Sequence, residues 1–94
     1  MKFGRKSGAL VLVFALAGCA LPPDGVTKQN IADYEVAVAS IGCEMVSESD
    51  YLPVELQAGL TRQQTLDVTA YHIAAGTAEK LPNGGVKLLT GACA

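Results

Sequence analysis

The sequence has 94 residues, of which 50% are hydrophobic and 17% charged, and its formal net charge at pH 7 is −2. A chain of this length forms at most one small domain with a marginal core. An acidic chain repels nucleic acid and gains nothing from anionic lipid headgroups, so the composition disfavours both as binding partners.

The first part of the chain has the three regions of a secretory signal peptide. Lys2, Arg5 and Lys6 form a positive head, residues 9–17 form an unbroken apolar run, and small residues then lead to Cys19. This order of regions is typical of a signal peptide. Because a membrane-spanning helix needs about 20 apolar residues, the shorter run here predicts a removable signal rather than a transmembrane helix.

The tetrapeptide Leu16-Ala17-Gly18-Cys19 makes this prediction more specific. It resembles the lipobox of bacterial lipoproteins, in which the cysteine sulfur receives a diacylglycerol, the chain is cut before the cysteine, and the new amino terminus is acylated. The resemblance implies that residues 1–18 are a signal peptide, that cleavage falls between Gly18 and Cys19, and that Cys19 carries the lipid anchor. A plain signal peptide, which needs no cysteine, is the alternative. The chain is also similar to small lipoproteins of alphaproteobacteria, a resemblance that brings no function with it.

The residues after the lipidated cysteine indicate where the folded part lies. Residues 19–29 contain two prolines and a glycine and are predicted to be a linker. The nine residues 20–28 reach at most about 30 Å when fully extended, so we expect the domain to lie close to its membrane. In Gram-negative lipoproteins, aspartate directly after the cysteine tends to retain the protein at the inner membrane, and here that residue is Ala20. The resemblance therefore implies the periplasmic face of the outer membrane, with the outer leaflet of the plasma membrane as the alternative.

Removal of the signal peptide changes the charge and cysteine counts. Of the 94 residues 76 remain, with four basic and nine acidic side chains, which give a formal net charge of −5. If Cys19 carries lipid, Cys43 and Cys93 are left as an even pair. Because the envelope outside the cytoplasm is oxidising, we predict a Cys43–Cys93 disulfide that ties the end of the first helix to the last residues of the sequence. Two buried free thiols are the alternative. No metal or other cofactor is expected, because His72 is the only histidine and no paired cysteine spacing exists.

The folded domain is predicted to cover residues 30–94 and to begin with a helix over residues 31–41. Asn30 is its expected N-cap and Gly42 its expected C-cap. Apolar residues at spacings of three, four and three predict its buried face, Ile31, Tyr34, Val38 and Ile41. Residues 43–46 are compatible with a short strand.

Two further helices are predicted on either side of Gly59. The first has Ser47, Ser49 and Asp50 as candidate caps and Pro53 in its first turn. Its apolar contacts are expected from Tyr51, Leu52 and Leu56. The second begins at the capping box formed by residues 61–64 and ends before Gly76. Its predicted buried stripe consists of Leu66, Ala70, Ile73 and Ala74.

A hairpin is predicted at the end of the domain, because Asn83-Gly84 lies between strand-compatible runs at residues 77–81 and 86–90. The predicted fold class is therefore α+β and mainly helical, with three short helices and a C-terminal β-hairpin. This order resembles a winged-helix domain, and the turn Gly59-Leu60-Thr61 and the wing tip Asn83-Gly84 carry the resemblance. The chain departs from it at Glu55, where helix-turn-helix DNA binders usually have alanine, and at Thr65, where they have a β-branched apolar residue.

The winged-helix resemblance implies DNA binding, but four basic residues are too few for the phosphate contacts that this needs, and export removes the protein from DNA. His72 has no assignable nucleophile beside it, so no catalytic residue and no enzyme activity are predicted. The sequence predicts a small membrane-anchored envelope lipoprotein that acts as a binding or structural module, with an unidentified envelope protein as its partner. The alternative is a ligand-binding or hydrolytic periplasmic protein that uses His72.

Overall fold

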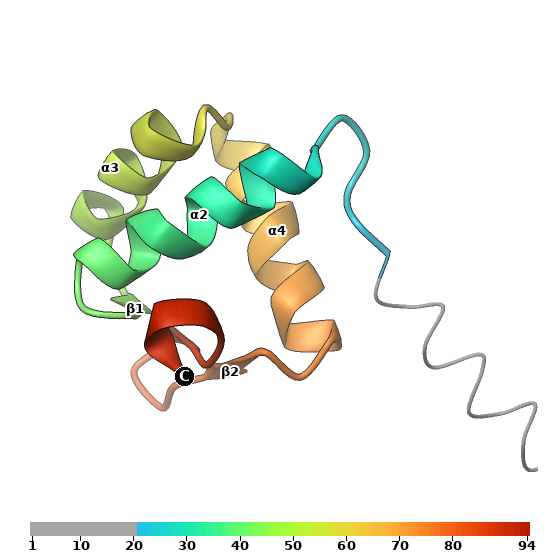
Figure 1. Ribbon diagram of the computed structural model, residues 1–94. Helices are drawn as coiled ribbons and strands as arrows, with labels where there is room; N and C mark the ends of the chain where they lie inside the picture. The colour runs from blue at the N-terminus through green and yellow to red at the C-terminus, as the bar shows by residue number, and fades with distance from the viewer. Residues whose placement is uncertain (1–20) are drawn as a thin grey trace, which may run out of the picture.

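The computed structural model describes residues 21–94, so the predicted signal peptide, its cleavage site at Gly18 and the lipid attachment at Cys19 lie outside the described residues. Figure 1 shows the helices packed above a small sheet. In chain order the elements are α2 (Lys28–Ser40), β1 (Glu44–Met45), α3 (Glu48–Ala58), α4 (Arg62–Ala74), β2 (Ala78–Lys80), β3 (Val86–Leu88) and the 3₁₀ turn η2 (Gly91–Cys93).

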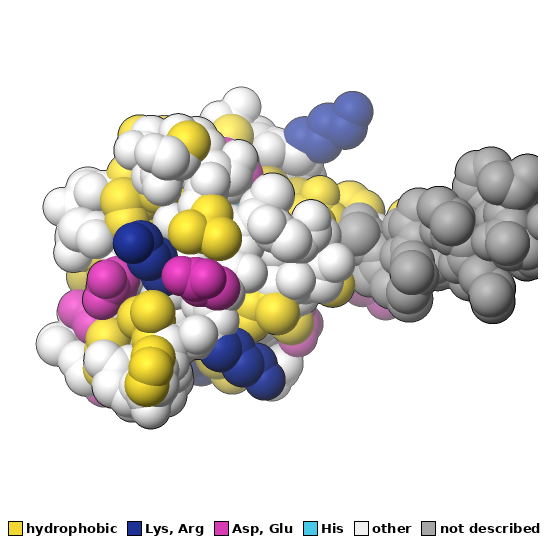
Figure 2. Space-filling view, turned by 90° about the horizontal axis from the view of Figure 1, so that it is seen from below, with side chains coloured by type: hydrophobic (Ala, Val, Ile, Leu, Met, Phe, Trp, Pro, Cys, Tyr) yellow, Lys and Arg dark blue, Asp and Glu magenta, His cyan; other side chains and the backbone are white. Residues whose placement is uncertain are grey.

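The sheet is antiparallel and has the strand order β1-β3-β2. The short strand β1 thus extends the predicted hairpin to three strands. This confirms the predicted α+β, mainly helical fold class, and the order of elements is the one that the winged-helix resemblance implied. In the register of the sheet, Lys87 on the central strand pairs with Glu44 on one side and Glu79 on the other. The underside of the molecule in Figure 2 shows a basic side chain between acidic ones, an arrangement that stabilises neighbouring strands.

The helix α2 begins three residues before the predicted start. Thr27 is the N-cap, and its hydroxyl accepts a hydrogen bond from the Asn30 amide at 3.0 Å, while the Asn30 side chain accepts one from the Thr27 amide at 2.9 Å. Asn30 is therefore the third helical residue of a capping box and not the N-cap, so the expected N-cap was wrong. Tyr34 and Val38 are buried as expected, together with Ala37.

The helix α3 packs against α2 through small side chains. Val54 and Ala58 are buried in the common core, whereas Leu52 and Leu56 are 51% and 75% exposed. The prediction that these two leucines supply core contacts was wrong. Pro53 is the sixth residue of α3 and not in its first turn, which corrects a second detail. Gly59 then ends α3 in the left-handed conformation, with φ of +67°.

The helix α4 starts at the predicted capping box, in which Thr61 and Gln64 bond reciprocally. Its buried side is formed by Thr65, Val68, Thr69 and His72. The predicted buried stripe was wrong for Leu66, Ala70 and Ala74, which are exposed, whereas Ile73 is partly buried and packs against the core. Burial of threonine costs little here, since the hydroxyls of Thr65 and Thr69 donate to backbone carbonyls one turn earlier at 2.9 and 2.8 Å.

The approach of β1 to the hairpin turn requires a glycine. A Cβ atom at Gly85 would lie 2.8 Å from Cγ2 of Val46 and 2.9 Å from the carbonyl oxygen of Met45. Both distances are shorter than van der Waals contact, so only glycine allows β1 to come this close. The three-stranded sheet therefore depends on this residue as well as on the Asn83-Gly84 turn.

Candidate functional site

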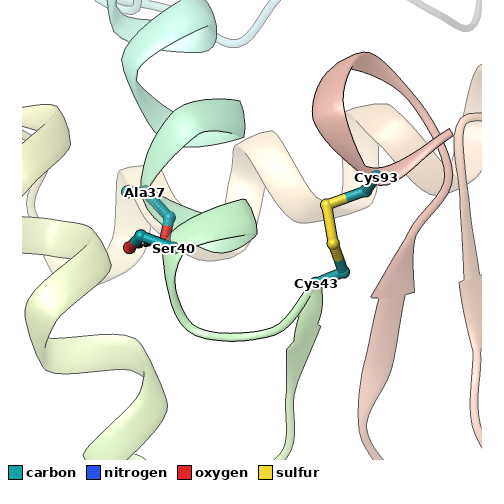
Figure 3. The surroundings of a disulfide bond; sticks show 4 residues. All are labelled: Ala37, Ser40, Cys43 and Cys93. Atoms are coloured by element: carbon teal, nitrogen blue, oxygen red, sulfur yellow. Dashed lines mark hydrogen bonds between the residues drawn. A yellow bond between two sulfur atoms is a disulfide. The ribbon is translucent and has the colours of Figure 1, made fainter.

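The structure joins Cys43 and Cys93, the pair expected from the sequence, in a disulfide (Figure 3). Their Cα atoms are 5.7 Å apart and 50 residues apart in the chain. The backbone of Cys43 is held on both sides, because its amide donates to the carbonyl of Val38 at 2.9 Å and its carbonyl accepts from the amide of Leu88 at 2.9 Å. The bond fixes η2 against the end of α2. Of the three cysteines in the sequence, Cys19 alone remains for another role.

The segment ahead of α2, which we call the tether (residues 21–27), runs along the outer side of α4 (Figure 1). Pro23 and Val26 close a turn through a backbone hydrogen bond of 3.2 Å, and Val26 packs against the core. Between the tether and α4 lies an open groove of about 460 Å³, lined by Leu21, Pro23, Asp24, Asp67, Ala70, Tyr71 and Ala74. Because α2 begins at Lys28, the last two residues of the predicted linker belong to the helix.

Part of the side of α4 that faces away from the core is apolar. We call it the α4 face and define it by Leu66, Ala70 and Ala74, which recur at helical spacing on one side of the helix, whereas the neighbouring Ile73 is partly buried and packs against the core. Leu66 is 42% exposed, and both alanines are exposed. The sequence therefore contains an apolar stripe, but the structure turns it outward beside the groove. Exposed apolar surface that forms a continuous patch is typical of an interaction site.

The sequence analysis did not single out Tyr71 and Asp67, which line the groove together with Ala70 and Ala74. The spacing of these four residues places them on one side of a helix. The paired threonines Thr65 and Thr69 are the signal that could have revealed this orientation. A threonine whose hydroxyl donates to a backbone carbonyl of its own helix can occupy a core position. The neighbouring Leu66 then lies on the exposed side of α4.

Arg62, the only lysine or arginine in α3 and α4, is engaged by carboxylates. Its guanidinium donates to Glu55 and to both carboxylate oxygens of Glu48, and it lies 5.2 Å from the centre of the Tyr51 ring. Hydrogen bonds from Arg62 hold the pKa of the Glu48 carboxyl below its usual range. The basic residue at the start of α4 is thus already paired, so the helix lacks a free cation for a phosphate group.

His72 is a core residue, with only 2% of its surface exposed. Its ring stacks on Tyr34 with the ring centres 5.4 Å apart, and Nδ1 lies 2.7 Å from the hydroxyl of Thr77. Nε2 has no hydrogen-bond partner and lies 3.4 Å from a carboxylate oxygen of Glu35. Burial lowers the pKa of His72 and raises that of Glu35. His72 does not line the groove beside α4.

Within residues 21–94, no group of three or more His, Cys, Asp or Glu side chains is arranged to hold a metal ion. In the same residues, no helix combines the length and the apolar character that crossing a membrane requires.

Comparison with known proteins found no match to this chain among family models, curated proteins or solved structures.

Proposed function

We propose that the protein is a lipid-anchored lipoprotein of the cell envelope whose small domain is a binding or structural module without catalytic activity. The sulfur of Cys19 receives a diacylglycerol, cleavage between Gly18 and Cys19 then frees the amino group of Cys19, and this amino group is acylated in a separate step. The observation that carries the proposal is the sequence Leu16-Ala17-Gly18-Cys19, which is separated from the tether by Ala20 alone. Because the residue after Cys19 is Ala20 and not aspartate, we propose the periplasmic face of the outer membrane as its location.

The disulfide supports this proposal in two ways. A bond between Cys43 and Cys93 suits an oxidising compartment outside the cytoplasm. It also consumes both cysteines of the domain, which leaves the sulfur of Cys19 as the one available for lipid.

The tether supports a location at the membrane surface. Its turn from Pro23 to Val26 is attached to the domain, so the free part of the chain after Cys19 is shorter than the sequence suggested. A domain on so short a connection stays beside its membrane and can meet only partners that are within reach there.

The charges of the helices support a partner other than nucleic acid. Proteins that bind DNA contact several phosphates with lysine and arginine. At the start of α4 the guanidinium of Arg62 is paired with Glu48 and Glu55, and the groove beside the helix contains Asp24 and Asp67. We therefore propose a protein of the envelope as the partner.

The test of the anchor is the intact mass of the protein extracted from membranes in detergent. We expect the loss of residues 1–18, the added mass of the diacylglycerol and acyl groups, and the loss of two hydrogen atoms for the disulfide. The matched control is Cys19→Ser, which removes the acceptor sulfur and should stay unprocessed. Recovery of wild-type protein with an unmodified Cys19 would contradict the proposal.

The test of the binding role is purification of the lipidated protein from mild detergent after chemical cross-linking in cells. A reproducible envelope protein in the cross-linked product is the expected result. Its absence across repeated preparations would contradict a binding module and leave a structural role for the domain.

A further inference from the structure

We propose that the α4 face rests on the lipid surface to which the chain is anchored, so that the domain docks on the bilayer through this face and Leu21. The inference rests on the proposed lipidation of Cys19 and adds an orientation to it. α4, at the position of the recognition helix of a winged-helix domain, would then face the membrane, while α3 and the sheet remain available to other partners.

The position of the anchor carries the argument. Leu21 is 71% exposed and lines the groove together with Ala70, Tyr71 and Ala74. Cys19 is two residues before Leu21, and consecutive Cα atoms are 3.8 Å apart, so its Cα lies at most about 8 Å from that of Leu21. This distance is smaller than the diameter of one helix, roughly 10 Å. A lipid attached at Cys19 therefore brings the bilayer surface to the side of α4 that bears the groove.

The tether is held on the domain close to the point where the anchor joins it. The φ angles of Pro22 and Pro23 are fixed by their rings. The turn between Pro23 and Val26 is closed by a hydrogen bond, and Val26 packs on the core. Residues 23–26 therefore keep a fixed place on the domain, and we expect the bilayer to meet the face beside this entry point.

The chemistry of the α4 face suits the boundary between headgroups and acyl chains. Leu66, Ala70 and Ala74 offer apolar contact, and Tyr71 has an apolar ring with a polar end, which favours such a boundary. Asp24 and Asp67 in the groove keep their carboxylates in the polar layer and repel anionic headgroups. Docking thus depends on burial of apolar surface alone and needs no anionic lipid.

The test uses tryptophan as a reporter, because the sequence contains none. Ala70→Trp places the reporter on the exposed α4 face, and Leu56→Trp places it at a matched apolar position on α3 that is 75% exposed and outside the groove. Each protein is prepared with its lipid, checked by intact mass, and reconstituted in phosphatidylcholine vesicles with brominated acyl chains. We expect the bromine to quench the Ala70→Trp protein strongly and to leave the Leu56→Trp protein unquenched, with or without added phosphatidylglycerol.

A second variant measures the contribution of apolar contact. Leu66→Asn in the Ala70→Trp protein removes the largest exposed side chain of the α4 face. Because Leu66 is 42% exposed, docking buries only part of a leucine, so the ratio of docked to undocked protein should fall about fivefold, and quenching should fall with it. Unchanged quenching would overturn the assignment of this face.

The results also separate this inference from the proposed function. Acylated protein whose two reporters are equally quenched or equally unquenched overturns the docking alone. Stronger quenching of the Leu56→Trp protein, or a blue-shifted Ala70→Trp emission without quenching, also overturns it, the latter because a second copy or another protein then covers the face. Protein without acyl mass overturns both the lipoprotein and its docking.

Discussion

Loss of the Cys43–Cys93 bond is the perturbation whose cost can be worked out most directly. The bond closes a loop with a sequence separation of 50 residues. In the chain-entropy model, release of a loop of this size returns about 14 cal/mol/K to the unfolded chain, or about 4 kcal/mol at 25 °C. A domain of this size is stable by roughly 4–11 kcal/mol in total. We therefore expect reduction to leave the domain marginally stable, with Tm lower by roughly 20 °C.

The assay is denaturation in urea, followed by far-ultraviolet circular dichroism, of residues 21–94 with the bond intact and after reduction. The double variant Cys43→Ser with Cys93→Ser provides a second reduced form that cannot reoxidise. Because the bond acts chiefly on the unfolded chain, we expect the native spectra of the three forms to agree while the midpoints differ. The m-value should rise on reduction, since the unfolded chain without a loop exposes more surface.

A decrease of less than about 1 kcal/mol in the free energy of unfolding of both reduced forms would refute the entropy reasoning. It would mean that the unfolded chain is already compact between the two cysteines. A loss accompanied by a large change in the native spectrum would refute it differently, since the bond would then be needed to form the helices and not only to restrict the unfolded state.

Three other substitutions test the packing and the electrostatics, each by urea denaturation. Val54→Ala removes two methyl groups from a fully buried position and should cost about 2 kcal/mol, whereas Leu56→Ala at its exposed position should change stability by less than about 0.5 kcal/mol; equal costs would contradict the placement of α3. Gly85→Ala should cost about 1–3 kcal/mol because its Cβ would collide with β1, and a neutral effect would disprove that close approach. Burial raises the pKa of Tyr34 to about 12, so the folded protein retains a phenol proton that the unfolded chain loses near pH 10. The contribution of Tyr34 to the free energy of unfolding is therefore fully present below pH 10 and is lost as the pH rises toward 12. Tyr34→Phe should therefore be about 1 kcal/mol less stable than wild type at pH 8, through the lost hydrogen bond to Thr69, and about equally stable at pH 11; a constant difference would contradict the shifted pKa.

The sequence predicted the helices and the hairpin well because their ends are marked by local chemistry. Capping residues, Gly59 and the Asn83-Gly84 turn act through contacts within a few residues, and such contacts can be recognised without the fold. The start of α2 was misplaced because Thr27 and Asn30 are both good capping residues. The N-cap is Thr27 because its side chain and that of Asn30 form the reciprocal hydrogen bonds of a capping box. The sequence alone does not show which of the two residues takes the N-cap position.

The orientation of α3 and α4 could not be predicted because it depends on the whole core. Hydrophobicity alone favours Leu56 and Leu66 as buried residues. The structure instead buries Val54, Ala58 and the two threonines of α4, since small side chains let the helices approach closely and the threonine hydroxyls are satisfied within the helix. The candidate site was missed for the same reason. Which side of α4 is exposed beside the tether depends on how the helix is oriented against the core.

The position of Cys93 in the chain sets the order of events during folding. Every α-helix and strand of the domain precedes Cys93, so the bond to Cys43 can close only after all of them are available to fold. Until then the chain lacks the constraint that accounts for a large part of its expected stability. In the export that we propose, oxidation would therefore complete folding only after the chain has crossed the membrane.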